Sequence, residues 1–343
     1  MKFKFYSIAA LALAITLIWI PCASSKDNIV LRMNHQQTGR EPGAKVDKWF
    51  VEEVAKRTNG AVKIQIFWAE ALGKAKETLG LLKEGGIDMA GLSPGYFPAE
   101  LPFFTAPNSL PMAMDNIQQA QLIMHTLLTE NPEFMQEADA NKVRPLFFHV
   151  LNPYLLISKE PVRKFEDLKG KKIRTWGEDM PKLAKAAGMT PVTMFMPELY
   201  EGLMRGVIDC APFSVDNIVT YKLQEVAKYI TEVVLWEGPT WGVWISSKAW
   251  DKLPADAQKI IMEVVEEAKK MDLKEVGQSA DTSRATLKEA GVEFIPFPDS
   301  ELKKWQDANP DFFESWIAKM EKLGKGAAAK DVVKTWKKLR AEN

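Results

Sequence analysis

Residues 254–290 read PADAQKIIMEVVEEAKKMDLKEVGQSADTSRATLKEA and are predicted to form the longest helix of the chain. Pro254 stands at its first turn and Gly291 lies just past its end, which is the pairing typical of a helix start and stop. At 1.5 Å per residue these positions would extend roughly 55 Å, longer than a small domain is wide. We therefore expect one helix that contacts both of two α/β lobes. The alternative is two shorter helices broken at Gly277, since an interior Gly costs about 1 kcal/mol.

Strands and helices alternate ahead of this helix. Strand periodicity at residues 28–34, 61–67 and 87–92, with helices at 41–58 and 75–83, gives the order β-α-β-α-β and predicts a mostly parallel sheet covered by helices. Further strands are predicted at residues 146–150, 155–158, 172–175, 190–194, 207–211, 229–236 and 241–246, with helices at 180–187 and 197–205. The last two strands flank Gly238-Pro239, where we expect the chain to cross between lobes.

The first 25 residues have the character of a secretory signal peptide. Lys2 and Lys4 precede an apolar run over residues 8–20, and small residues follow Pro21 up to Ser25. The run has about 13 residues, whereas a spanning helix needs roughly 20. Cleavage near Ser25 predicts a periplasmic protein, and Pro21 before Cys22 makes lipid anchoring at Cys22 the less favoured alternative.

Composition excludes several classes of protein. Lys plus Arg equal Asp plus Glu at 45 each, so no net charge favours nucleic acid. The chain has 3 His and 2 Cys, at no metal-ligand spacing, and no phosphate-binding or dinucleotide-binding Gly motif. We therefore expect neither metal nor cofactor. Cys210, the one Cys of the processed chain, is expected to be a buried thiol rather than half of an intermolecular disulfide.

One motif suggests catalysis but fails on mechanism. Gly91-Leu92-Ser93-Pro94-Gly95 matches G-x-S-x-G after a strand, the pattern of a hydrolase nucleophile elbow. The residue after the nucleophile must donate its backbone N–H to the oxyanion, and Pro94 has none. A secreted serine hydrolase using Ser93 is thus kept only as the alternative class, and the sequence predicts no enzyme.

The chemically informative stretch is DLKGKKIRTWG, residues 167–177. A strand at residues 172–175 would place Arg174 at its carboxyl end, where open α/β sheets bind ligands. A guanidinium holds a carboxylate through two parallel hydrogen bonds, so Arg174 is the candidate anchor for an organic acid.

This stretch and several others resemble the solute-binding proteins of tripartite ATP-independent periplasmic (TRAP) transporters, the DctP-type family. The matching segments cover essentially the whole processed chain: ALG at 71–73 with Glu77, GIDM at 86–89, AGMTPV at 187–192, PELY at 197–200, GVID at 206–209, VAKY at 226–229 and WDKLP at 250–254.

The resemblance implies a two-lobed periplasmic solute-binding fold of the α/β class with a long helix across both lobes. Lobe I would comprise residues 26–150 and about 239–278, and lobe II residues 151–238 and about 279–343. It further implies that Arg174 anchors the ligand's carboxylate and that the protein, as a monomer, delivers the ligand to TRAP membrane subunits. Service to an ATP-driven importer is the alternative.

Departures from the family pattern bear on the ligand. Sialic-acid binders of the family carry a second Arg where this chain has Tyr154, and metal-using binders carry a Glu where it has Pro212-Phe213. Aromatic residues occupy or flank the segments that line the cleft in relatives: Phe67, Trp68, Tyr96, Tyr154, Trp176, Phe213 and Trp241. We therefore expect an aromatic or apolar monocarboxylate. A dicarboxylate or sugar acid is the alternative, with Asn217 or Lys222 as the additional donor.

Overall fold

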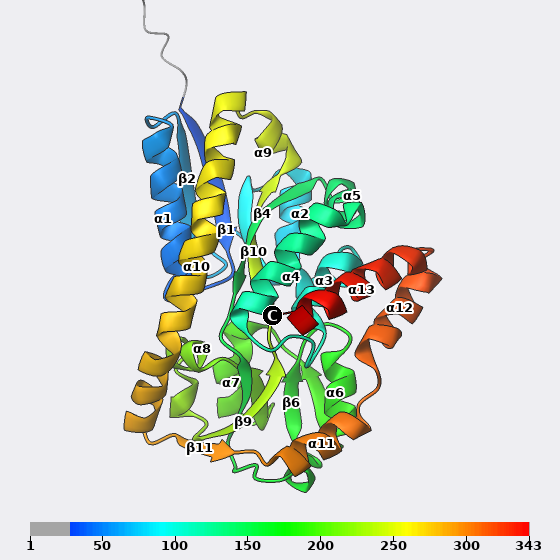
Figure 1. The fold of residues 1–343 in the computed structure, drawn as a ribbon. Helices are drawn as coiled ribbons and strands as arrows, with labels where there is room; N and C mark the ends of the chain where they lie inside the picture. Colours follow the sequence, from blue (N-terminus) through cyan, green and yellow to red (C-terminus); the bar gives the residue numbers. More distant parts are fainter. Residues whose placement is uncertain (1–27, 343) are drawn as a thin grey trace, which may run out of the picture.

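The computed structural model describes residues 28–342, which form two β-sheets flanked by helices (Figure 1). The predicted signal peptide, with Cys22, lies outside the described residues. Within the described range no helix has the length and apolar character that a membrane span requires.

The first sheet has the strand order β2-β1-β3-β10-β4. The strand bounds in this order are Val62–Phe67, Ile29–His35, Met89–Leu92, Pro239–Ser246 and Val143–Val150. The pairs β1–β2 and β1–β3 are parallel, as the β-α-β-α-β order predicts. β10 runs antiparallel between β3 and β4, so the sheet is mixed because a strand from late in the chain enters it.

The second sheet has the order β11-β9-β5-β8-β6-β7. Its strands span Glu293–Pro296, Tyr229–Trp236, Tyr154–Ser158, Cys210–Phe213, Lys172–Thr175 and Thr190–Thr193. β6 pairs in parallel with β7 and β8, whereas β5 is antiparallel to β8 and β9. The chain passes from the first sheet to the second between β4 and β5, and returns between β9 and β10. Gly238 lies at this return, between the end of β9 and the start of β10 at Pro239.

Helices cover both sheets (Figure 1). Their bounds are Pro42–Arg57 (α1), Thr78–Glu84 (α2), Pro102–Ser109 (α3), Ile117–Glu130 (α4), Pro132–Ala140 (α5), Met180–Ala186 (α6), Leu199–Met204 (α7), Val215–Thr220 (α8), Ser247–Asp251 (α9), Ala255–Glu289 (α10), Asp299–Ala308 (α11), Phe312–Lys322 (α12) and Gly326–Glu342 (α13). Short 3-10 helices include η2 (Pro94–Tyr96), η4 (Met196–Glu198) and η5 (Leu223–Glu225).

The long helix α10 is continuous over 35 residues. It starts after Pro254 and stops before Gly291, whose φ of 76° ends the helical path. It continues through Gly277, so the predicted single helix is confirmed and the two-helix alternative is wrong. In Figure 1 α10 runs from the end of the molecule that carries α9 to the end that carries β11.

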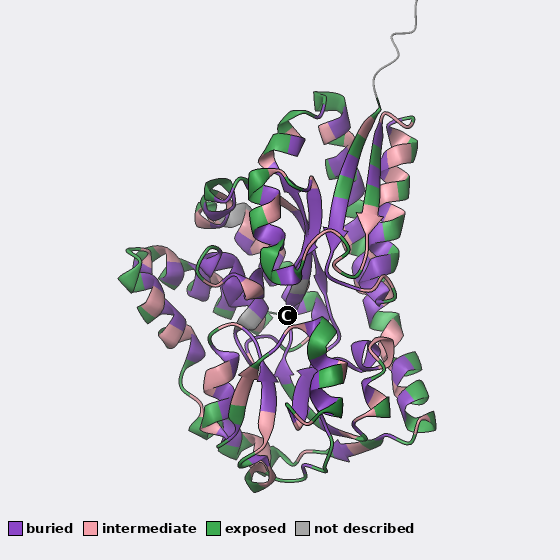
Figure 2. Ribbon diagram, turned by 180° about the vertical axis from the view of Figure 1, so that it is seen from behind, coloured by how far each residue is buried: buried purple, intermediate pink, exposed green. Residues whose placement is uncertain are grey.

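The buried face of α10 contributes to both hydrophobic cores. Its first half places Ile261 and Val265 in the core that β1 and α1 build around Phe50. Its second half places Val276 and Leu287 in the larger core, which extends through the second sheet. The strands of both sheets are largely buried (Figure 2). The helix thus ties the two halves together by burial of apolar surface at about 25 cal/mol per Å².

The C-terminal helices contact both halves of the molecule. Trp305 of α11 donates its indole N–H to Leu183 O, on the side of the second sheet. Trp316 of α12 and Trp336 of α13 donate theirs to Pro102 O and Ala113 O, beside α3 and α4. The division of the chain into lobes at about residues 239 and 279 stays a prediction.

Candidate functional site

The predicted anchor Arg174 lies near the end of β6 and is only 2% exposed. Its guanidinium sits over the Trp176 ring, with Cζ 4.1 Å from the ring centroid. Nε donates a hydrogen bond of 3.2 Å to Met194 O, and Nη1 is buried without a hydrogen-bond partner. A buried cation with an unpaired donor is costly on its own, so this atom requires a partner from outside the chain.

A small cavity surrounds this guanidinium. Its empty volume is about 220 Å³, and its lining comes from segments attached to both sheets: Ser93, Tyr96, Asn108, Tyr154, Arg174, Trp176, Met196 and Trp236. Four of the sequence-predicted site residues, Arg174, Trp176, Tyr154 and Tyr96, therefore meet here. The cavity lies beside the carboxyl ends of β1, β3 and β6, where sheets of this type bind ligands.

Hydrogen bonds join the two sides of this cavity. Trp176 donates its indole N–H to Asn108 O at 3.2 Å. The backbone N–H of Met196 donates to the Tyr96 hydroxyl at 3.4 Å, and burial raises the pKa of Tyr96. Because the partners sit on segments of different sheets, these bonds hold the two halves against each other around the cavity.

A second link between the halves lies nearby. The Tyr221 hydroxyl donates a hydrogen bond to Oε1 of Gln37 at 2.5 Å. Gln37 is the second residue after the end of β1. Burial raises the pKa of Tyr221 well above its usual value, so the hydroxyl keeps the proton that it donates.

Aromatic rings form much of the cavity wall. Tyr154 meets Trp236, Phe213 and Trp176 edge-on, at centroid distances of 4.8, 5.5 and 5.7 Å. Phe213 is fully buried behind Tyr154 and does not line the cavity itself. The wall thus combines aromatic ring surface with polar side chains, since Ser93, Tyr96 and Asn108 also line the cavity beside Arg174.

The remaining predicted residues lie elsewhere. Trp68 packs against His35 with centroids 4.5 Å apart, and Trp241 packs against His149 at 4.6 Å. Phe67 ends β2 half-buried, outside the cavity lining. Asn217, on α8, is fully buried, and neither Oδ1 nor Nδ2 of its amide has a partner. Lys222 is exposed, in a left-handed backbone conformation with φ 57°.

Sequence reasoning missed three residues that line the cavity: Asn108, Met196 and Trp236. Asn108 lies in α3 and Met196 in η4, and no local sequence pattern distinguishes these positions from other residues of short helices. Trp236 had a usable signal, because it ends β9 immediately before the crossing at Gly238.

Ser93 lies in the cavity wall but lacks the surroundings of a nucleophile. Its backbone N–H donates to Gln36 Oε1, and its hydroxyl donates to Asn108 Oδ1 at 3.3 Å. Neither partner is a base, and Pro94 contributes no oxyanion N–H. Over residues 28–342 no group of three or more His, Cys, Asp or Glu side chains is arranged to hold a metal ion.

A buried cluster of acids and histidines lies where β1, α1, β4 and α10 meet. Asp47 on α1 is hydrogen-bonded through Oδ2 to Nε2 of His35 and through Oδ1 to Nε2 of His149, each at 3.0 Å. Asp272 on α10 is hydrogen-bonded through Oδ1 to Nδ1 of His149 at 2.6 Å. All four side chains are at most 1% exposed. We call these four residues the His–Asp cluster.

The protonation of the His–Asp cluster follows from its geometry. Nδ1 of His35 accepts the backbone N–H of Gln37, so the His35 proton sits on Nε2 and faces Asp47. Both nitrogens of His149 face carboxylates, so this ring is an imidazolium. Burial alone would lower the pKa of His149, but the charges of Asp47 and Asp272 raise it to about 10. Burial opposes ionisation of Asp47 as well, yet His149 and His35 hold its pKa well below the usual range.

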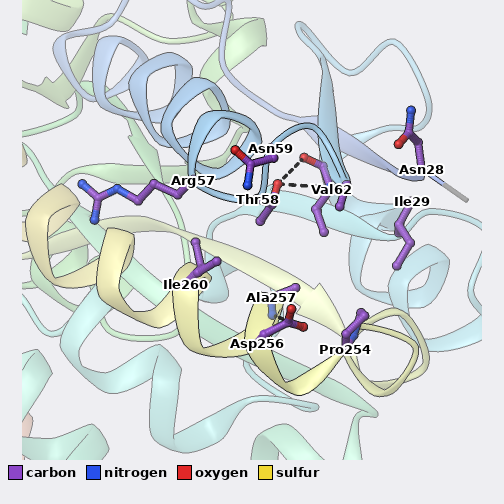
Figure 3. A pocket seen from close by; sticks show the side chains of 11 residues that line it. Asn28, Ile29, Arg57, Thr58, Asn59, Val62, Pro254, Asp256, Ala257 and Ile260 are labelled. Atoms are coloured by element: carbon purple, nitrogen blue, oxygen red, sulfur yellow. Dashed lines mark hydrogen bonds between the residues drawn. The ribbon is translucent and has the colours of Figure 1, made fainter. Parts of the chain in front are cut away.

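A wider groove lies at the opposite end of the first sheet, where β1 and β2 begin (Figure 3). The start of α10, with Pro254 and Ile260, forms one wall. The polar groups here have protein partners: Thr58 Oγ1 bonds Val54 O, and Arg57 forms ion pairs with Glu53 and Glu267. The groove therefore lacks the unpaired buried donor that distinguishes the cavity beside Arg174.

The thiol of Cys210 does not line the cavity beside Arg174. Cys210 of β8 is a free, buried thiol, and burial raises its pKa to about 12. Its expected state is confirmed.

The fold is that of the two-lobed solute-binding proteins. The family model of bacterial extracellular solute-binding proteins, family 7 (DctP), matches residues 33–319. The chain therefore belongs to this family of transport receptors, and the resemblance to TRAP solute-binding proteins seen in the sequence is confirmed.

Individual relatives agree. A solute-binding protein of Albidiferax ferrireducens is 28% identical over 286 residues, which cover 80% of this chain and 82% of the relative. A Bordetella pertussis extracytoplasmic solute receptor, DctP7, which binds pyroglutamic acid, superposes with a TM-score of 0.82 at 20% identity, covering 90% of this chain and 99% of its own. A TRAP periplasmic solute-binding protein of Sulfitobacter with bound β-D-galacturonate has a TM-score of 0.78 at 22% identity, covering 90% and 99%.

Proposed function

We propose that this protein is a periplasmic receptor that captures a small organic monocarboxylate with an aromatic or apolar body. It carries the ligand to TRAP membrane subunits as a monomer and catalyses no reaction. The observation that carries the proposal is Nη1 of Arg174, which is buried beside the cavity and has no hydrogen-bond partner.

A carboxylate meets the requirement of this atom best. Nε of Arg174 is already engaged with Met194 O, so Nη1 is the free donor that faces an incoming anion. A charge-assisted hydrogen bond to a carboxylate is roughly twice as strong as a neutral one, and it neutralises the buried cation. The Trp176 ring under the guanidinium fixes its plane.

The aromatic wall favours a compact ligand with a flat or apolar body. Tyr154, Trp176 and Trp236 meet edge-on around the cavity, and such rings bury apolar surface with defined geometry. The pyroglutamic acid bound by the Bordetella receptor is a monocarboxylate of this compact kind.

A sugar acid or dicarboxylate is the second candidate. The buried amide of Asn217 has both a donor and an acceptor without partners, as a ligand hydroxyl would need. The galacturonate bound by the Sulfitobacter protein belongs to this class. Lys222 supports the dicarboxylate less, because its side chain is exposed.

A thermal-shift screen of the processed protein from Lys26 onward tests the proposal. The panel contains orotate, benzoate and pyroglutamate, with D-glucuronate and succinate as the competing classes, and Arg174→Ala is run beside the wild type. A ligand at about 1,000 times its Kd adds roughly 4 kcal/mol, which raises Tm by several degrees. We expect a shift from a monocarboxylate with a flat or apolar body that is lost in Arg174→Ala. Shifts from glucuronate or succinate alone would contradict the ligand class, and no shift from any acid would contradict the role of Arg174.

A further inference from the structure

A second unpaired donor lies at the same cavity. Trp236 is 1% exposed and lines the cavity, and its indole N–H has no hydrogen-bond partner. Its ring is held edge-on by Tyr154 at 4.8 Å and by Trp176 at 5.9 Å. The indole is therefore fixed in place by packing while its one polar atom is left unsatisfied.

Five other buried indoles in the described chain are paired. Trp176 donates to Asn108 O, Trp244 to Leu92 O and Trp336 to Ala113 O. Trp241 also has an unpaired N–H, but it packs against His149 and lies outside the cavity lining. A buried indole N–H usually finds a partner, so an unpaired one at a cavity wall points to an acceptor on whatever fills that cavity.

We infer that Trp236 Nε1 donates a second hydrogen bond to the ligand's carboxylate, beside the one from Arg174. This inference rests on the proposed function and extends it to a residue that sets specificity. A carboxylate has two oxygens with about four acceptor positions, so it accepts from both donors.

The neutral donor has a consequence for specificity. An indole N–H directs one acceptor without adding positive charge, whereas a second guanidinium would also attract a second carboxylate. The cavity therefore holds one cation, Arg174, for one anionic group. This favours a monocarboxylate over a dicarboxylate.

Removal of the N–H alone is the test. Trp236→Phe and replacement of Trp236 by benzothienylalanine, which keeps the bicyclic shape but has no N–H, are titrated calorimetrically with orotate, pyroglutamate and benzoate. For the acid that binds the wild type, both variants should weaken binding ten- to a hundredfold, the range expected for a hydrogen bond to a charged group. Tm of the ligand-free benzothienylalanine variant should stay equal or rise, since an unsatisfied buried donor has been removed.

Trp244→Phe is the matched control. It also removes an indole N–H, but one that is paired with Leu92 O, so its stability should fall while its affinity stays within twofold of wild type. A benzothienylalanine variant that binds within twofold of wild type would overturn the inference. If Arg174→Ala still loses binding in that case, the proposed function stands without Trp236. If no acid of the panel binds the wild type, the inference and the proposed function both fail.

Discussion

Two buried sets of polar groups in this protein differ in whether their hydrogen bonds are completed within the chain. In the His–Asp cluster, His149 has a carboxylate at each ring nitrogen and His35 has a partner at each of its own. At the cavity, Arg174 keeps one buried donor without a partner. The ring nitrogens of the cluster thus all have partners within the chain, whereas Nη1 of Arg174 has none.

This difference separates a structural role from a binding role. When a buried charge is paired within the fold, removal of its partner lowers the stability of the protein, because the remaining charge is then buried unpaired. A buried charge that the fold leaves unpaired lowers stability until a ligand supplies the counter-charge. Substitutions in the two regions should therefore change different measured quantities.

The largest effect is expected in the His–Asp cluster. Asp47→Asn removes the charge between two histidines and leaves the His149 imidazolium with only Asp272. The free energy of unfolding from urea titration should fall by about 3–5 kcal/mol. Glu275→Gln, which breaks the exposed pair with Lys45, is the control and should change it by less than about 0.5 kcal/mol. A loss below about 1 kcal/mol in Asp47→Asn would show that the cluster does not support the fold.

The next effect concerns ligand binding. Arg174→Met should cost about 2–5 kcal/mol of binding free energy, because the ligand's carboxylate would be buried unpaired. Unfolding of the ligand-free protein should be unchanged or need more urea, since an unsatisfied buried charge has gone. Arg163→Met, at an exposed ion pair with Glu293, should change neither quantity. Retained affinity together with reduced stability would reverse the roles assigned to the two regions.

The paired region should also show a characteristic dependence on pH. His149 has a pKa of about 10 in the folded protein against 6.5 as its usual value, so its stabilising contribution is complete below pH 6.5. That contribution decreases as pH rises toward 10, by up to about 1.4 kcal/mol per pH unit. Urea titrations of wild type and His149→Gln from pH 6 to pH 10 check this.

The variant curve serves as the reference, because burial also raises the pKa of Glu137, to about 7. Subtraction of the two curves removes the contribution of Glu137. A difference between wild type and His149→Gln that stays constant over this range would contradict an imidazolium at position 149.

The smallest effect sharpens the role of the long helix. Gly277 lies on α10 between Asp272 of the cluster and Ser279, and a Cβ added there would make ordinary contact with Ile117 at 3.5 Å. Gly277→Ala should therefore stabilise the protein by about 0.5–1 kcal/mol with ligand affinity unchanged. Destabilisation would indicate that the helix needs to bend at this position.

The long helix and most strands could be predicted from the sequence because their signals are local. Pro254 and Gly291 mark the ends of α10, and alternation marks β1 and β2. The antiparallel insertion of β10 between β3 and β4 could not be predicted, since pairing of strands whose partners are 89 or more residues apart depends on tertiary contacts.

The site shows the same division. The position of Arg174 near a strand end and beside the cavity could be predicted, whereas its role as the carboxylate anchor stays a proposal. The aromatic lining residues were harder to predict from the sequence. No sequence feature distinguishes Trp68 and Trp241 from Trp176, yet Trp68 and Trp241 pack against histidines and do not line the cavity. Asn108 of α3 and Trp236 of β9 belong to different halves of the molecule, and only the tertiary fold brings them to the same cavity.

The most direct measurement is a crystal structure of the complex with the acid that gives the largest thermal shift. We predict that the ligand's carboxylate lies in the cavity between the sheets, within about 3 Å of Arg174 Nη1. A ligand bound in the groove between β2 and α10, or one in the cavity whose carboxylate points away from Arg174, would contradict it.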